Sequence, residues 1–432
     1  MKLLSVLLAL VSASYAQNAS AGQVQPISTE GLVGNSSRFN TILRVDNGTY
    51  GPPIEEVHYF YKYWPIGIAV SSTGRIFVTY TRGKYDYTVA EVANMTAEVP
   101  YPSLDIQLPP DQLNETIAGI SFGPGNASAL ISVQALHITS ATSSRPETLW
   151  MVDTGRPTIQ DSTGAYTMPY AQPGGPKLIA ISLDNNTIYQ TYTFPPTVHY
   201  PDSYLNDLRF DLNQSVAYLV DSSSEGRPGF IMVNLTTGES WRRLTQHPTV
   251  SDVHNSIASH QGHPFYLNSG MGPNVYPRPE GLDGIQVSPD GQYMYYSPLT
   301  SQYLYRIPTA NLLAPPTDPL AELAASANIS HLGQRGGQAN GFEGDTTGKI
   351  YMLMPEHNAI YYYDPSDLQV HGFVEDPRII WPDGASVGQD GYIYMIINQL
   401  PYQDGWNDGI DQRIWPGAIL RAKLEEGGTK VN

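Results

Sequence analysis

Six copies of one short pattern recur along this chain of 432 residues. In each copy an apolar strand is followed by a short turn and a second strand rich in tyrosine, and five of the six copies have the same length. The copies begin at Ile68, Leu136, Leu208, Ile285, Phe342 and Ala385. Their spacing of roughly 45 to 75 residues is typical of repeat architectures in which every unit packs on its neighbours.

Strand-forming residues dominate between the copies as well. Tyr, Val, Ile and Thr are frequent, and 39 Gly and 35 Pro interrupt the strands at short intervals. Further strand candidates bring each repeat to about four strands, and four-stranded sheets repeated around an axis form a β-propeller. We therefore predict an all-β, six-bladed β-propeller with four-stranded blades around a central channel. A parallel β-helix is the alternative, but its turns recur every ~20 to 25 residues.

The ends of the chain differ from the repeats. Residues 1–16 combine a charged start, an apolar segment and small residues at a cleavage position, which indicates a signal peptide. We expect residues 17–56 to be an N-terminal extension that could take part in blade closure, residues 57–424 to be the propeller and residues 425–432 a C-terminal tail. No later segment reaches the ~18 consecutive apolar residues that a membrane-spanning helix needs.

Asn-X-Ser/Thr sequons are frequent, which agrees with export through a secretory path to the extracellular space. Beside Asn18, which follows the predicted cleavage position closely, nine are candidate glycosylation sites: Asn35, Asn47, Asn94, Asn114, Asn126, Asn185, Asn213, Asn234 and Asn328. Roughly half of them could be incidental in a chain rich in Asn, Ser and Thr. Because the chain has no cysteine, disulfides and thiolate metal sites are excluded, and stability depends on burial alone.

The formal net charge is -17. Nucleic acids and anionic membrane surfaces bind to clusters of Lys and Arg, so this charge argues against both as partners. We expect a small-molecule ligand and a monomeric protein.

Amide or carboxylate side chains stand two positions before five of the six predicted first strands, where the inner strands of a propeller converge on one mouth of the channel. We call the six residues at this position the ring residues: Ile66, Gln134, Asn206, Asp283, Asn340 and Asp383. Two carboxylates and three amides facing each other could bind a divalent cation or an ammonium group. The alternative is turn chemistry, since Gly follows four of the six positions. Glu343 and Asp345 are expected near the same mouth.

Two other features invite a functional interpretation. Asp153-Thr154-Gly155 resembles the aspartate motif of aspartic proteases, but those enzymes need a second such carboxylate and the chain has no second motif. Trp381 and Trp406 lie in loop-like sequence beside the last inner strand, where an aromatic ring could stack on a ligand.

Several segments resemble the yellow and major royal jelly protein family, over about residues 57–424. The matching segments are LWMVDTGR at 149–156, PKLIAISLDNNTIYQTYTFP at 176–195, AYLVDSSSEGRPGFIMVNLTTGESWR at 217–242 and GIQVSPDGQYMYYSPL at 284–299. The resemblance implies a secreted six-bladed propeller with a ligand channel, used in insect members for aromatic amines or for tautomerising dopachrome-like melanin precursors.

The resemblance also implies individual pocket residues. The family's Asn-X-Leu/Met/Phe-Pro turn after the last inner strand matches Asn398-Gln399-Leu400-Pro401, so Asn398 and Leu400 are expected to line the pocket. The chain departs from the insect members in having no cysteines and in carrying Asp383-Gly384 where the family has Ser-Asp, which makes the mouth more acidic.

Three functions remain open at this point. The first is a propeller that binds a small aromatic or amine ligand through Asn206, Asp283, Asn340, Asp383, Asn398 and Leu400, with Asp283 and Asp383 as candidate catalytic residues for a dopachrome-type tautomerisation. The second is a lactonase-type hydrolase that holds a divalent cation such as calcium through Asn206, Asp283, Glu343 and Asp383. The third is a non-catalytic extracellular protein.

Overall fold

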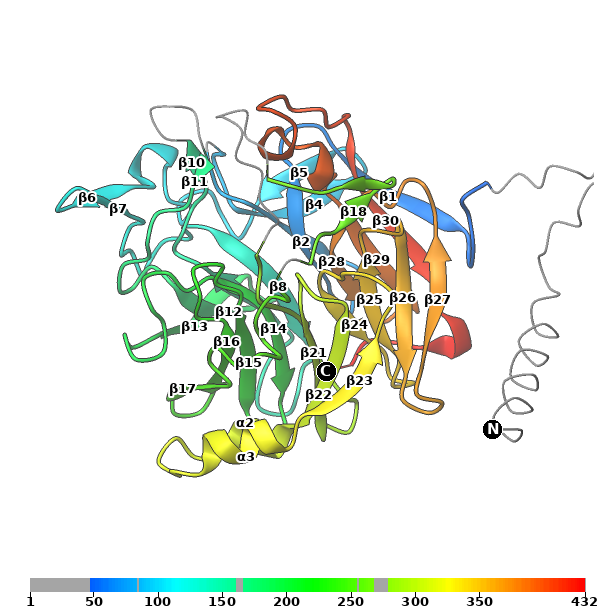
Figure 1. The fold of residues 1–432 in the computed structure, drawn as a ribbon. Coiled ribbons are helices and arrows are strands. Elements are labelled where there is room, and N and C mark those ends of the chain that lie inside the picture. Colours follow the sequence, from blue (N-terminus) through cyan, green and yellow to red (C-terminus); the bar gives the residue numbers. More distant parts are fainter. Residues whose placement is uncertain (1–46, 84, 161–165, 255, 268–278, 432) are drawn as a thin grey trace, which may run out of the picture. The chain divides into compact units, whose positions relative to one another are not determined.

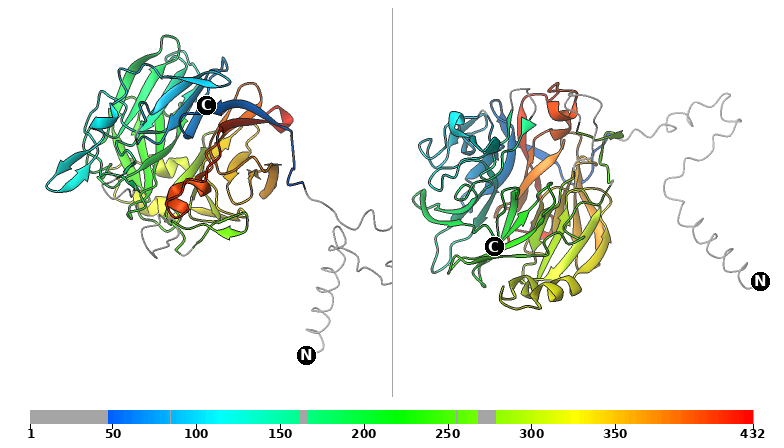
Figure 2. Two further views of the ribbon diagram at one scale, coloured as in Figure 1. Left: turned by 90° about the horizontal axis from the view of Figure 1, so that it is seen from above. Right: turned by 60° about the vertical axis from the view of Figure 1, so that its left-hand side comes forward.

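The six repeated segments form the two innermost strands of six four-stranded antiparallel sheets. The computed structural model describes residues 47–431 except 84, 161–165, 255 and 268–278. The predicted signal peptide and the sequons at Asn18 and Asn35 lie outside the described residues. The unit Gly48–Asn432 is a β-propeller, so the predicted all-β, six-bladed fold is confirmed (Figures 1 and 2).

The first three blades follow one another along the chain, each from its inner to its outer strand. Blade 1 contains β2 (Pro65–Val70), β3 (Ile76–Tyr80), β4 (Val89–Asn94) and β5 (Ala97–Pro100). Blade 2 contains β8 (Val133–Thr139), β9 (Thr148–Asp153), β12 (Lys177–Ser182) and β13 (Thr187–Thr193). Blade 3 contains β14 (Leu205–Asp211), β15 (Val216–Asp221), β16 (Gly229–Asn234) and β17 (Ser240–Arg243).

The next two blades repeat this order, and the last one takes its outer strand from the other end of the chain. Blade 4 contains β20 (Leu282–Val287), β21 (Tyr293–Pro298), β22 (Tyr303–Pro308) and β23 (Ser330–Gln334). Blade 5 contains β24 (Phe342–Gly344), β25 (Ile350–Met354), β26 (Ala359–Asp364) and β27 (Gln369–Glu375). Blade 6 contains β28 (Pro382–Val387), β29 (Tyr392–Ile397), β30 (Gly417–Lys423) and β1 (Ile54–Phe60).

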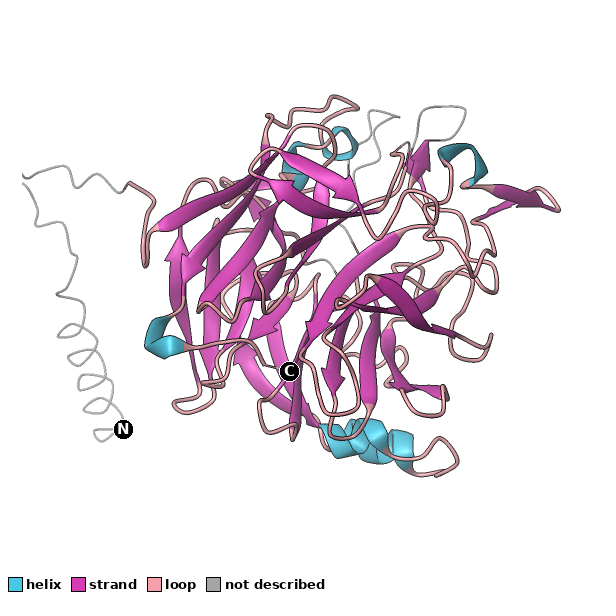
Figure 3. Ribbon diagram, turned by 180° about the vertical axis from the view of Figure 1, so that it is seen from behind, coloured by secondary structure: helices cyan, strands magenta, loops and turns pink. Residues whose placement is uncertain are grey.

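Short accessory elements decorate the blades, and helices are few (Figure 3). Three two-stranded sheets pair β6 (Glu115–Ile117) with β7 (Ile120–Phe122), β10 (Ile159–Gln160) with β11 (Tyr166–Thr167), and β18 (Ser259–His260) with β19 (His263–Pro264). The helices are α2 (Thr309–Leu313), α3 (Ala321–Ala327), and the 3₁₀ turns η3 (Pro110–Gln112), η4 (Leu400–Tyr402), η5 (Asp404–Trp406) and η6 (Glu425–Gly427). No helix among the described residues is long and apolar enough to cross a membrane.

The second and third strands of the blades carry most of the core. Every residue of β9, β12, β15 and β25 is buried, whereas the outer strand β13 is exposed along most of its length. Strands covered on both faces read as continuous apolar runs rather than as alternating patterns. The core is therefore a series of layers between neighbouring blades, and a chain without cysteine obtains its stability from these layers.

Strand β1 closes the propeller by pairing antiparallel with β30, from Ile54 opposite Ala422 to Phe60 opposite Gly417. Its side chains also contact blade 1, since the buried His58 ring lies 2.6 Å from a carboxylate oxygen of Glu98. Phe60 is fully buried in the core cluster shared by the first and last blades. Strand β1 therefore joins the last blade to the first and closes the circle of blades.

The C-terminal residues also pack against the propeller. Lys430 forms an isolated β-bridge with Asp345, just after the end of the inner strand β24, and the Thr346 backbone N–H donates to the Thr429 carbonyl at 2.9 Å. Lys430 is buried, and this burial lowers the pKa of its ammonium group to about 8. Because Asp345 follows its inner strand whereas the ring residues stand at the strand starts, the tail lies at the end of the channel opposite the mouth.

The ring residues are placed by β-bulges. The register with the second strand breaks at Ile66, Gln134, Asn206, Asp283 and Asp383, one break near the start of each of five inner strands. A bulge inserts an extra residue and re-aims its side chain. In blade 5 the corresponding Asn340 lies just before β24, and its backbone N–H donates to the Leu353 carbonyl at 2.9 Å. Five of the six inner strands thus begin three residues earlier than the sequence predicted, whereas β24 begins at Phe342 as predicted.

The glycines that follow four ring residues allow neighbouring inner strands to approach each other. A Cβ atom would lie 2.8 Å from the carbonyl oxygen of the next blade's ring residue in three cases: Gly67 against Gln134, Gly284 against Asn340, and Gly384 against Ile66. The same atom on Gly341 would lie 3.5 Å from the Asp383 carbonyl oxygen. None of the four has a left-handed backbone conformation, so close packing rather than turn chemistry explains them.

Replacing Phe60 with alanine is expected to lower the free energy of unfolding by about 3–5 kcal/mol, because it leaves a cavity between the first and last blades. Chemical denaturation followed by tryptophan fluorescence measures this loss. Tyr61→Ala is the matched control, since Tyr61 is 58% exposed and its loss is expected to change stability by less than ~0.5 kcal/mol. Equal losses in both variants would contradict a closing role for β1.

Replacing Gly384 with alanine is expected to cost about 1–3 kcal/mol of stability, since the new Cβ would meet only backbone atoms that cannot move aside. It would lie 2.8 Å from the Ile66 carbonyl oxygen and 3.2 Å from Gly67 Cα. Gly405→Ala is the control, because a Cβ there has no neighbour within 4 Å. A Gly384→Ala protein as stable as this control in the same denaturation experiment would refute the close-packing explanation.

Candidate functional site

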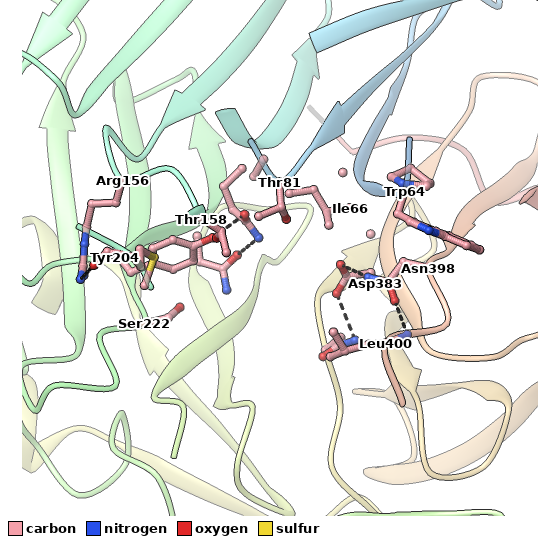
Figure 4. A pocket seen from close by; sticks show the side chains of 18 of the residues that line it. Trp64, Ile66, Thr81, Arg156, Thr158, Tyr204, Ser222, Asp383, Asn398 and Leu400 are labelled. Atoms are coloured by element: carbon pink, nitrogen blue, oxygen red, sulfur yellow. Dashed lines mark hydrogen bonds between the residues drawn. The ribbon is translucent and has the colours of Figure 1, made fainter. Parts of the chain in front are cut away.

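The channel mouth opens into a cavity of about 1140 Å³. All six ring residues line it, so residues separated by more than 300 positions in the sequence face one space. Its upper walls come from loops outside the repeats, chiefly the segment around Thr158 and Met168 in blade 2 and the segment from Asn398 to Arg413 between β29 and β30. Figure 4 shows Arg156 and Tyr204 on one side and Trp64, Asp383 and Asn398 on the other.

Hydrogen bonds join the polar ring residues in two groups. In the first group the Tyr204 hydroxyl donates to Gln134 Oε1 at 2.6 Å, and Gln134 Nε2 donates to Asn206 Oδ1 at 3.1 Å. Asn206 Nδ2 then donates to Asp283 Oδ1 at 2.7 Å. Each amide therefore presents its oxygen to one neighbour and its N–H group to the next, and the series ends on a carboxylate.

The second group is centred on Asp383. Its Oδ1 accepts from Asn340 Nδ2 at 3.3 Å and its Oδ2 from Asn398 Nδ2 at 2.6 Å. Asn398 is itself oriented by the Leu400 backbone N–H, which donates to its Oδ1 at 2.9 Å. Asn398 and Leu400, the two residues implied by the family motif, both line the cavity, and Asn398 fixes the orientation of Asp383.

Aromatic side chains form another part of the lining. Trp64, Tyr85, Tyr204 and Trp406 all reach the cavity. The Trp64 ring stacks on Trp415 with centroids 4.1 Å apart. Of the two tryptophans named from the sequence, only Trp406 lines the cavity, whereas Trp381 is 2% exposed and packs against Phe265.

Negative charge exceeds positive charge in the lining. The carboxylates are Asp111, Asp207, Glu280, Asp283, Asp383 and Asp404, and the guanidinium groups are Arg156, Arg209 and Arg413. Each guanidinium pairs with a carboxylate outside the lining: Arg156 with Glu225 at 3.0 Å, Arg209 with Glu343 at 3.0 Å and Arg413 with Asp411 at 2.6 Å. Arg209 also pairs with the lining carboxylate of Asp207 at 2.8 Å. Within the described lining, six carboxylates against three guanidinium groups give the cavity an acidic character.

Asp207 is a lining carboxylate that the sequence analysis missed, although it directly follows Asn206. Both residues fall within the same bulge of β14, between Leu205 and Leu208. Burial raises the pKa of Asp207 to about 6, even though Arg209 nearby lowers it. The sequence showed only that a second polar residue, Asp207, follows Asn206. The repeat pattern does not reveal that a bulge brings both side chains to the cavity.

Glu343 and Asp345 do not line the cavity. Glu343 accepts from Arg209 and from the Val387 backbone N–H at 3.2 Å, deeper in the channel. Asp345, at the far end of β24, accepts from the Tyr351 hydroxyl at 2.9 Å and is fully buried. Their expected position near the mouth is therefore wrong, since only the start of an inner strand faces the mouth.

The four oxygen donors of the metal alternative, Asn206, Asp283, Glu343 and Asp383, do not converge. Glu343 is ion-paired to Arg209, and Asn206 presents its N–H group rather than its oxygen to Asp283. Among the described residues no group of three or more His, Cys, Asp or Glu side chains is placed to hold a metal ion. The residues present therefore do not fit a calcium site of the predicted composition.

The aspartate of the Asp153-Thr154-Gly155 motif has a structural role. Asp153 forms a buried ion pair with Lys177 at 3.0 Å, and its oxygens accept from the backbone N–H groups of Ile131, Ser132 and Gly155. Asp221 occupies the same place at the end of β15, where it pairs with Arg242 at 2.9 Å. These carboxylates hold the start of an inner strand against the blade.

The described sequon asparagines lie at the surface, where glycosylation stays a prediction. Asn47, Asn94, Asn114, Asn185, Asn213 and Asn328 are exposed, and Asn126 and Asn234 are half-buried. Asn114 also borders the cavity.

Comparison with known proteins gives a family match. The family model described as "Major royal jelly protein" matches residues 131–427, which is more than half of the chain. No curated protein matches the chain in sequence.

Solved structures that match the chain include a luciferin-regenerating enzyme (11% identity, TM-score 0.47, covering 88% of this chain and 97% of that one). Others are a calcium-binding protein, regucalcin, from Agrobacterium tumefaciens (10%, 0.47, 88% and 98%) and a gluconolactonase from Xanthomonas campestris (10%, 0.43, 88% and 99%). The family match confirms the resemblance found in the sequence: the chain belongs to the major royal jelly protein family.

Proposed function

We propose that this protein is secreted and binds a small aromatic amine in the cavity at the channel mouth. The observation that carries the proposal is that, among the described residues, six carboxylates, three guanidinium groups and several aromatic rings line one cavity. The predicted signal peptide and the exposed sequons support the extracellular location.

The charge of the lining favours a cationic ligand. An ammonium group that leaves water needs a carboxylate and further hydrogen-bond acceptors to replace its hydration. Asp283 is 7% exposed and is held in place by Asn206, so it offers an oriented acceptor. An anionic ligand would bind less well than a cation, because each lining arginine already pairs with a carboxylate.

The aromatic lining favours a planar, partly apolar ligand. Trp64, just before β2, lies beside Asp383 and Asn398 (Figure 4), and Trp406 belongs to the segment between β29 and β30. Aromatic faces bind both rings and cations. Cavities that bury small ligands usually measure ~300–1,000 Å³, so this one can enclose an arylalkylamine completely. The resemblance to insect members that bind aromatic amines points to the same ligand class.

The enzymatic form of the proposal is a dopachrome-type tautomerisation. Such a reaction moves one proton within the substrate and consumes no co-reactant, so a carboxylate base and a nearby hydrogen-bond donor are sufficient. Asp283 and Asp383 are the candidate bases, and the Tyr204 hydroxyl and the ring amides are the available donors. Loss of dopachrome absorbance, measured with and without the protein, distinguishes turnover from binding alone.

Tyramine is expected to bind the wild-type protein more tightly than 4-ethylphenol, which has the same ring without the ammonium group. Asp283→Asn is expected to weaken tyramine binding about 10- to 100-fold, because a hydrogen bond to a charged group contributes about 1.5–3 kcal/mol. Isothermal titration calorimetry measures both. Asp283 suits this test, since asparagine still offers an oxygen to Asn206, whereas Asp383→Asn would place two amide N–H groups opposite each other.

Asp105→Asn is the matched control, because Asp105 is an exposed carboxylate outside the cavity. Its tyramine affinity is expected to equal that of the wild type. The absence of binding of tyramine, dopamine and serotonin at millimolar concentration would refute the proposed function. A loss in Asp105→Asn as large as in Asp283→Asn would show that net charge alone, and not the cavity, attracts the amine.

A further inference from the structure

A continuous chain of hydrogen bonds crosses three blades at the mouth and joins Tyr204, Gln134, Asn206 and Asp283. Gln134 lies on β8 of blade 2, Asn206 on β14 of blade 3 and Asp283 on β20 of blade 4, and Tyr204 stands just before β14. The successive donor–acceptor distances along the chain are 2.6, 3.1 and 2.7 Å. A tyrosine hydroxyl group is thus connected to the Asp283 carboxylate through two amide side chains.

The charge at one end of this chain determines the direction of every bond in it. An ionised carboxylate only accepts hydrogen bonds, so Asn206 turns an N–H group to Asp283 and its oxygen to Gln134. Gln134 in turn directs an N–H group to Asn206 and its oxygen to Tyr204, whose hydroxyl group donates to it. The two amides are therefore oriented from both ends, by a carboxylate and by a hydroxyl group.

The orientation of an amide depends on its partners, because its shape hardly changes when it turns by 180°. A turned Gln134 would place its oxygen opposite the Asn206 oxygen. If Asn206 turned as well, its oxygen would face the carboxylate of Asp283 instead of donating to it. Hydrogen bonds in one chain polarise each other, so the hydroxyl group at the far end also strengthens the bond to Asp283.

Tyr204 has a fixed position at the edge of the cavity (Figure 4). Its backbone N–H donates to Asp221 Oδ1 at 2.9 Å, and its carbonyl accepts from the Ser222 backbone N–H at 2.9 Å. Asp221 is fully buried and is itself held by Arg242. The hydroxyl group that starts the chain is thus placed by a rigid part of blade 3.

We infer that Tyr204 and Gln134 are positioning residues for Asp283, which keep the ring amides in the orientation that fixes its carboxylate for the ammonium group of the ligand. The inference rests on the proposed function and adds a determinant of its selectivity for cations. Loss of the hydroxyl group at one end of the chain weakens the binding of the charged group at the other end. Ligands without an ammonium group do not depend on the Asp283 carboxylate and keep their affinity.

The test measures the binding of tyramine and 4-ethylphenol to Tyr204→Phe by isothermal titration calorimetry. This substitution removes the hydroxyl group and keeps the aromatic ring. Tyramine is expected to bind about 3- to 10-fold more weakly, the effect of one neutral hydrogen bond, whereas 4-ethylphenol stays within about 2-fold of the wild type. Tyr303→Phe is the control with unchanged affinity, since Tyr303 is 38% exposed and lies outside the cavity.

Equal losses for both ligands in Tyr204→Phe would show that Tyr204 acts on the ligand directly rather than through Asp283, and the inference would be wrong. It would also be wrong if Tyr204→Phe bound tyramine as tightly as the wild type.

Double variants test whether the residues act in series. Gln134→Met removes both polar ends of the middle residue at similar volume, and we expect it to weaken tyramine binding as much as Tyr204→Phe does. The double variant is expected to lose no more than either single variant, because both substitutions interrupt the same chain. In the Asp283→Asn background, Tyr204→Phe is expected to change tyramine affinity by less than about 2-fold. Additive losses in either pair would contradict the inference.

A measurement without ligand separates this inference from the proposed function. The side-chain N–H signals of Asn206, assigned by their absence in Asn206→Ser, are followed by ¹⁵N NMR in the full-length protein. Tyr204→Phe is expected to shift them, and Tyr303→Phe to leave them unchanged. Shifted signals in a protein that binds no arylalkylamine would support the positioning of Asp283 and refute the proposed ligand. Unchanged signals in Tyr204→Phe would refute the inference, whatever the affinity for tyramine.

Discussion

The close approach of six inner strands around one axis is the constraint on which the rest of this structure depends. At Gly67, Gly284 and Gly384 a single methyl group would collide with the carbonyl oxygen of the ring residue in the next blade. That proximity allows the Asn206 amide to reach Asp283 in the neighbouring blade and the Asn340 amide to reach Asp383. The polar mouth and the packing of the blades are therefore two results of the same backbone geometry.

Buried ion pairs orient the strands that bear the site. Asp153 with Lys177 and Asp221 with Arg242 hold the starts of two inner strands through backbone N–H groups, and Arg209 connects blade 3 to Glu343 of blade 5. Such pairs add little net stability over apolar packing, because desolvation offsets their attraction. In a chain without disulfides their contribution is to specify one arrangement of the blades, while the apolar layers between blades supply the stability.

The cavity joins this rigid ring to loops that the repeats do not predict. Hydrogen bonds fix the carboxylates of Asp383 and Asp207, whereas the aromatic side chains of Trp64 and Trp406 come from connecting segments. In propellers and other scaffolds the strands commonly position the polar functional residues, and the loops shape the opening to fit a ligand. This division explains how loops outside the repeats complete an acidic mouth on this fold.

The amino-acid sequence by itself determined the six repeats, the four-stranded blades, the family and the polar ring, because each depends on local periodicity or on motifs that can be read in order. It misplaced Glu343 and Asp345, missed Asp207 and left open whether Gly384 belongs to a turn. Those details depend on where a bulge falls and on which atoms of another blade lie nearby, and the partners are far apart in the sequence. Only the tertiary structure decided them, since a one-residue shift in register turns a side chain from the channel into the blade.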